Sequence, residues 1–120
     1  MRTLILLGAS CLLLLACNDS SNGDTLIGAS CDTSSMCGPA GVCITSGKDG
    51  ECALPCQVPG GVGECPLHTY CDSENVTTDT HKQESDMTLC FPACTVDADC
   101  RDGYKCKGVS SGPGKICAPK

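Results

Sequence analysis

Hydrophobic residues form one long run near the start of the chain and only scattered short groups after it. The run covers residues 4–15 (LILLGASCLLLL), follows Met1-Arg2, and gives way to polar residues from Asn18. An apolar stretch of this length behind a basic start is typical of a signal peptide. It is shorter than the roughly 17 residues that a membrane-spanning helix needs. We therefore predict that residues 1–16 are a signal peptide.

Beyond residue 17 the apolar positions are too sparse to predict helices or a conventional core. Four leucines, three isoleucines, six valines and one phenylalanine remain, and no segment repeats them at helical spacing over three turns. So few apolar side chains cannot hold a fold by themselves, which excludes a Rossmann enzyme, a helix bundle or a sandwich. We predict strands of two to four residues, short β-hairpins and irregular loops, with little regular secondary structure.

Cysteine supplies the organisation that the apolar pattern lacks. Fourteen of the 120 residues are cysteine, a fraction above the roughly 8–10% that marks a disulfide scaffold. From Cys31 onward the spacing repeats in groups of four, with five residues between the second and third cysteine of each group. This phased repeat predicts a small disulfide-rich fold of three tandem modules, at residues 31–52, 53–90 and 91–120. Their cysteines are Cys31, Cys37, Cys43 and Cys52; Cys56, Cys65, Cys71 and Cys90; and Cys94, Cys100, Cys106 and Cys117.

Each module can close two disulfides, which makes six in all. Four cysteines allow three pairings, and the sequence does not choose among them. We favour first-to-third and second-to-fourth pairing, because interleaved loops pin a short chain from both ends. Each bridge would contribute about 2–4 kcal/mol by restricting the unfolded chain.

The end of the leader, Leu14-Leu15-Ala16-Cys17, resembles the lipobox of bacterial lipoproteins. The resemblance implies cleavage before Cys17, diacylation of its thiol and acylation of its new amine, so that palmitate-type chains anchor the protein in a membrane. Asn18 in place of an aspartate favours transport to the outer membrane. Residues 17–30 would then form a lipidated, flexible tether. The alternative is an ordinary secretory signal that happens to meet a cysteine.

The third module carries a second resemblance. Its segment 94–106 (CTVDADCRDGYKC) resembles the Dickkopf N-terminal cysteine-rich region, and similar repeats occur in surface lipoproteins of myxobacteria. The resemblance implies a small binding module. We therefore expect a non-catalytic binding, adhesion or structural protein that faces the periplasm or the exterior.

The sequence shows little sign of metal binding, catalysis or nucleic-acid binding. The chain has no C-x-x-C pair, so a zinc site is not predicted, and we expect no cofactor and no enzyme activity. The acidic run 97–102 lacks the ligand order of an EF-hand and predicts a turn stabilised by carboxylates. The two histidines, His68 and His81, are expected to be solvated. Beyond the leader, seven Lys and Arg oppose 14 Asp and Glu, which makes nucleic acid a poor partner.

One long gap stands apart from the repeat. Eighteen residues separate Cys71 from Cys90, where the other modules have 8 and 10. The spacing predicts a long loop at residues 72–89, and a tolerated surface insertion is the interpretation that we favour. Loops fixed at both ends by cross-links often carry binding function, so this loop is also the candidate site for a protein or glycan partner. The candidate binding residues are Asp72, Glu74, Asp79, His81, Lys82, Glu84 and Asp86.

Two further functional hypotheses stay open. A rigid disulfide scaffold could present a loop to a protease and inhibit it. A secreted eukaryotic peptide without lipid would explain the glycosylation sequon Asn75-Val76-Thr77.

Overall fold

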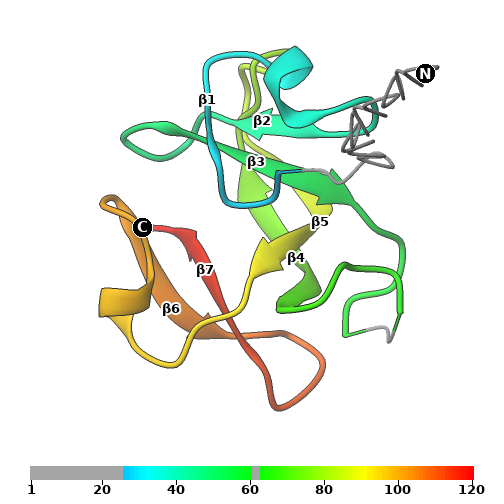
Figure 1. The fold of residues 1–120 in the computed structure, drawn as a ribbon, viewed down its shortest axis with the longest axis vertical. Helices are drawn as coiled ribbons and strands as arrows, with labels where there is room; N and C mark the ends of the chain where they lie inside the picture. Colours follow the sequence, from blue (N-terminus) through cyan, green and yellow to red (C-terminus); the bar gives the residue numbers. More distant parts are fainter. Residues whose placement is uncertain (1–25, 61–62) are drawn as a thin grey trace, which may run out of the picture.

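The computed structural model describes residues 26–60 and 63–120, so the predicted leader and Cys17 lie outside the described residues. The described chain forms seven short β-strands and two 3₁₀ turns, without an α-helix (Figure 1). This confirms the predicted small, disulfide-rich fold of hairpins and irregular loops. No helix among these residues is long and apolar enough to span a membrane. The elements are β1 (Ser30–Cys31), η1 (Ser34–Cys37), β2 (Val42–Ile44), β3 (Gly50–Pro55), β4 (Thr69–Val76), β5 (Ser85–Pro92), η2 (Asp97–Asp99), β6 (Tyr104–Gly108) and β7 (Lys115–Pro119).

Every module is built on the same hairpin, in which the third and fourth cysteines lie directly opposite each other. The opposed pairs are Cys43 and Cys52 on β2–β3, Cys71 and Cys90 on β4–β5, and Cys106 and Cys117 on β6–β7. Neither member bonds to its opposite. Each reaches back to a cysteine earlier in its own module, so two bridges clasp the base of each hairpin.

The predicted first-to-third and second-to-fourth pairing is confirmed in all three modules. The first-to-third bridges span Cα–Cα distances of 5.9, 6.0 and 5.9 Å, and the second-to-fourth bridges span 5.2, 5.6 and 5.4 Å. Within residues 26–60 and 63–120, every disulfide lies inside one module. The bridges are Cys31–Cys43, Cys37–Cys52, Cys56–Cys71, Cys65–Cys90, Cys94–Cys106 and Cys100–Cys117.

The prediction of a long loop at residues 72–89 is wrong. Most of this segment belongs to β4 and β5, which have eight residues each and pair without interruption from Thr69–Pro92 to Val76–Ser85. These strands are also longer than the two to four residues expected. Val76 and Leu89 are fully buried and fix the inward face, while the polar residues between them conceal this pattern in the sequence.

The first two modules share one antiparallel sheet. Its strand order is β1-β3-β5-β4, with β2 also paired to β3. β3 and β5 run past the predicted boundaries at residues 52 and 90, so from here the first module includes residues up to Pro55 and the second up to Pro92. The two modules join where Leu54 pairs with Cys90 and Pro55 with Leu89. The third module is a separate two-stranded sheet, β6–β7, that lies beside β4 and β5 (Figure 1). An isolated bridge between Ala93 and Ile116 connects the two sheets.

One small apolar cluster is shared by all three modules. Phe91 on β5 is its largest apolar side chain and is completely buried. Partly buried Val42, Met87 and Val109 pack around the cluster. The scarcity of apolar residues predicts that cross-links alone stabilise the fold, but the modules also share this buried core. The fully assembled cluster consists of Ile44 and Ala53 from the first module, Val76, Leu89 and Phe91 from the second, and Ile116 and Ala118 from the third.

Candidate functional site

Two of the predicted binding residues join β4 to the third module. Asp72 is fully buried, and both of its carboxylate oxygens accept the backbone N–H of Ser110 at 3.1 Å. Glu74 forms an ion pair with Lys107 at an N–O distance of 2.6 Å. Both carboxylates are therefore committed to contacts inside the protein.

A third predicted residue, Asp79, joins the end of the long hairpin to the first module. Its carboxylate accepts the backbone N–H of Ser34 at 2.7 Å and also the Ser34 hydroxyl, and these hydrogen bonds lower the pKa of Asp79. Beside it, Thr77 accepts the N–H of Thr45 at 2.8 Å. The turn thus docks against β2. Only the tip keeps exposed candidates, which are His81, Lys82, Glu84 and Asp86.

The acidic run of the third module forms the carboxylate-stabilised turn that was predicted. Asp99 accepts the backbone N–H groups of Thr95 and Val96 at 2.8 and 3.1 Å, and these bonds lower the pKa of Asp99. Asp97 accepts the N–H of Cys106 at 2.8 Å. Asp99 therefore pairs backbone N–H groups at the start of the 3₁₀ turn, and Asp97 joins the turn to β6.

Three sets of cysteine sulfurs lie close enough together to suggest a metal cluster by distance alone. In each set the atoms lie within 4.8 Å of one another. All of these sulfurs belong to disulfides, and a disulfide sulfur lacks the thiolate charge that binds a metal. The proximity follows from two bridges meeting at the base of each hairpin. The sets are Cys31, Cys37 and Cys43; Cys56, Cys65 and Cys71; and Cys94, Cys100 and Cys117.

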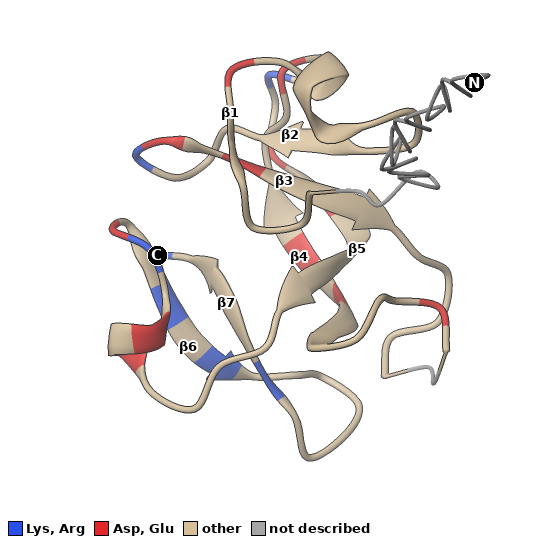
Figure 2. Cartoon of the chain, viewed as in Figure 1, with Lys and Arg blue, Asp and Glu red and all other residues tan. Residues whose placement is uncertain are grey.

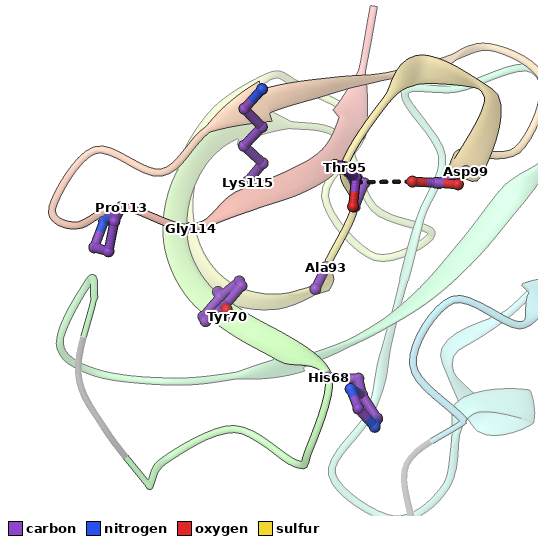
Figure 3. A pocket seen from close by; sticks show the side chains of 9 residues that line it. His68, Tyr70, Ala93, Thr95, Asp99, Pro113, Gly114 and Lys115 are labelled. Atoms are coloured by element: carbon purple, nitrogen blue, oxygen red, sulfur yellow. Dashed lines mark hydrogen bonds between the residues drawn. The ribbon is translucent and has the colours of Figure 1, made fainter.

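A surface groove runs between the second and third modules. It consists of two adjoining hollows of about 560 and 450 Å³, a size typical of small-ligand sites. One end is mainly apolar and includes Leu67 and Val109. The other end is more polar and includes Thr95 and Lys115 (Figure 3). The residues common to both hollows are His68, Tyr70, Ala93, Pro113 and Gly114.

Tyr70 is held in the middle of this groove by a close contact with Gly114. A Cβ atom added to Gly114 would lie 2.9 Å from the Tyr70 ring, so only glycine permits the ring to sit there. The Tyr70 side chain nevertheless remains 45% exposed. An aromatic ring held in this way offers apolar area to a partner at a low entropy cost.

The wall next to Tyr70 is a tight turn with an unusual backbone. His68 has a φ of 64°, the one positive value outside glycine in the part of the chain that the structure describes. Thr69 donates to the Pro66 carbonyl at 3.2 Å, and the His68 carbonyl accepts the N–H of Ala93 at 2.9 Å. Backbone in this region is costly and clusters at functional sites. Leu67, at the tip of the turn, is 85% exposed.

Charge is distributed unevenly over the modules. Among the described residues, five of the seven Lys and Arg lie in the third module, and nine of the twelve Asp and Glu lie in the other two (Figure 2). Lys115, at the polar end of the groove, belongs to this basic module. The net negative charge of the whole chain conceals a basic surface on β6–β7.

Comparison with known proteins leaves the site to be interpreted from its own geometry. No protein-family model, no curated protein and no solved structure matches this chain. Sequence reasoning missed the groove because its walls, near residues 66–70 and 113–115, lie in different modules. The sequence offered one signal, since Tyr70 is one of only three aromatic residues.

Proposed function

We propose that this protein is a lipid-anchored, non-catalytic binding module of the bacterial cell envelope. Acyl chains on Cys17 would hold it at the outer membrane, facing the periplasm or the exterior, with the groove around Tyr70 as its binding surface. The observation that carries the proposal is the preformed groove, in which a fixed aromatic ring stands between walls clasped by disulfides. Six disulfides suit an oxidising compartment outside the cytoplasm.

The groove chemistry favours recognition of a partner. It combines an aromatic platform, the exposed apolar Leu67 and the cationic Lys115, a combination of apolar surface and a few polar groups that is common in ligand sites. Asp99, the carboxylate at the polar end, already binds two backbone N–H groups of its own turn. The partner is a protein or a glycan of the envelope.

The tight turn at residues 66–69 weighs against the protease-inhibitor hypothesis. Leu67 is the most exposed large apolar residue of the described chain and would be the natural side chain to enter a protease pocket. Its turn is closed by the hydrogen bond between Thr69 and Pro66, whereas peptides that add to a strand of a partner are extended. Binding in the groove needs no such extension.

Substitution of Tyr70 tests the binding proposal. Retention of the intact chain would be measured separately on immobilised envelope glycan and on immobilised envelope proteins. Loss of a central aromatic contact typically costs 2 kcal/mol or more, so Tyr70→Ala should weaken retention by roughly 30-fold on one of the two supports. Val96→Ala is the matched control, because Val96 is exposed and lies outside the groove. Equal retention of Tyr70→Ala and the native chain on both supports would refute the proposal.

The anchor is tested by the intact mass of membrane-extracted protein. A chain that begins at Cys17, heavier by acyl groups and unreactive toward an alkylating agent before reduction, is the expected result. Cys17→Ser should lose the added mass and leave the membrane fraction. A native mass without lipid would refute the anchor and favour simple secretion.

A further inference from the structure

The joint between the first and third modules encloses a buried acid. Glu51, the second residue of β3, is 2% exposed and is covered by Tyr104 at the start of β6, which is also 2% exposed. Within the described chain, neither Glu51 Oε2 nor the Tyr104 hydroxyl has a hydrogen-bond partner in suitable geometry. Buried polar atoms without partners are costly and uncommon, so this joint is a locally unfavourable part of the interior.

The groups around Glu51 come from both modules. Arg101 lies 5.8 Å from the centre of the Tyr104 ring and donates to the Gly50 carbonyl and to the Ser30 hydroxyl, each at 2.9 Å. At the exposed rim, Lys48 pairs with Asp102 at 2.7 Å. A further carboxylate, Asp49, acts on Tyr104 from the turn before β3. The joint thus has an acid and a phenol inside, one cation beside them and an ion pair at its edge.

This environment favours a protonated Glu51 below neutral pH. Burial raises the pKa of Glu51 to about 7, although the charge of Arg101 and the hydroxyl of Tyr104 partly oppose the shift. Burial, followed by the neighbouring Glu51, also raises the pKa of Tyr104, so the phenol stays neutral. Glu51 is therefore the group in this joint that changes its charge near neutral pH.

The third module is free of covalent ties to the other two apart from the chain itself. Its two bridges, Cys94–Cys106 and Cys100–Cys117, are internal. Its other contacts with the first two modules include the shared core, the bonds of Ser110 and Lys107 to Asp72 and Glu74, and the Glu51 joint. The groove has one wall on the second module, at Tyr70, and the other on the third, at Gly114. A movement of the third module would therefore change the width of the groove.

We propose that Glu51, Tyr104 and Arg101 form a proton-operated latch that keeps the groove closed while Glu51 is protonated and loosens it when Glu51 ionises. A buried carboxylate without sufficient partners is unfavourable, and outward movement of the third module lets water solvate it. The consequence for ligand binding rests on the proposed function of the groove. The movement itself does not, because it is measured without any ligand.

Amide hydrogen exchange of the intact chain in detergent tests the latch. The informative amides are Ser110, bonded to Asp72, and Ala93, bonded to the His68 carbonyl, because each of these hydrogen bonds joins the third module to the second. If Glu51 has its ordinary pKa of 4.5 in the open form and about 7 in the closed form, opening should become roughly 50- to 100-fold more frequent between pH 5 and pH 8. Exchange is corrected for its intrinsic pH dependence. Corrected protection that stays constant over this range would overturn the proposal.

Variants assign the effect to the latch. Glu51→Gln should give protection that is independent of pH, whereas Asp32→Asn, which removes an exposed carboxylate of the first module, should keep the native pH dependence. Tyr104→Phe removes a hydroxyl that lowers the pKa of Glu51, so the midpoint of opening should move to higher pH. If Glu51→Gln fails to fold, the direction of the Tyr104→Phe shift decides. An unchanged midpoint in Tyr104→Phe refutes the latch. If the native chain shows pH-dependent exchange but binds neither envelope glycan nor envelope protein, only the proposed function is refuted.

Discussion

Replacing Phe91 by alanine tests whether the three modules depend on one core. The Phe91 ring is completely buried among residues from all three modules, and truncation of a buried phenylalanine costs about 3–5 kcal/mol. Burial of about 200 Å² at about 25 cal/mol per Å² gives a similar value, about 5 kcal/mol. Because the bridges remain closed and hold each module together, we expect a loss near 4 kcal/mol without complete unfolding.

The assay combines guanidinium unfolding of the oxidised chain with amide hydrogen exchange. A shared core predicts that exchange accelerates around Ile44 in the first module and Ile116 in the third, as well as around Phe91. Val96→Ala, at a position that is 55% exposed, serves as the control and should change the free energy of unfolding by less than about 0.5 kcal/mol. If exchange accelerates only in the second module, or if the cost falls below about 1 kcal/mol, the modules fold independently and the shared core is not what holds them together.

Three further perturbations have directions set by single contacts. Asp72→Ala leaves the Ser110 N–H without its buried acceptor and should cost about 1–3 kcal/mol in guanidinium unfolding, with Asp72→Asn costing less; equal costs would contradict this role. Replacing both Cys65 and Cys90 by alanine should lower the free energy of unfolding by about 3–4 kcal/mol, because their disulfide closes the longest loop, with a sequence separation of 25. A smaller loss than that caused by removing Cys31–Cys43, with a separation of 12, would contradict the loop-entropy argument. Gly47→Ala places a Cβ 2.5 Å from a buried tyrosine ring and should lower the melting temperature, whereas an unchanged melting temperature would show that the ring moves freely.

Cysteine spacing predicted the modules because a cross-link constrains position more directly than an apolar side chain does, whereas the pairing was favoured on the argument that interleaved loops pin a short chain. The carboxylate turn at Asp97 and Asp99 was predictable for a similar reason, since its hydrogen bonds are local in the sequence. The long hairpin was missed because only Val76 and Leu89 are both apolar and fully buried between Cys71 and Cys90.

The features that depend on contacts between modules could not be derived from the sequence. Tyr70 meets Gly114 across the groove, and Glu51 meets Tyr104 across the joint, in both cases over more than 40 residues of chain. Glu51 lies in a six-residue strand, where a charged residue would ordinarily be placed on the solvent side. Its burial follows from how the third module docks.

The opposed cysteines at the base of each hairpin make its length adjustable. The gaps between third and fourth cysteines hold 8, 18 and 10 residues, all even numbers. Residues added in pairs at the turn, one to each strand, extend both strands equally and leave every existing side chain on its original face. A single residue inserted within a strand would instead move the side chains that follow it to the opposite face. The same base can therefore support an arm of any even length. Duplication followed by paired insertion is a route by which one ancestral hairpin could give rise to three arms of different reach, and an engineer could lengthen them by the same rule.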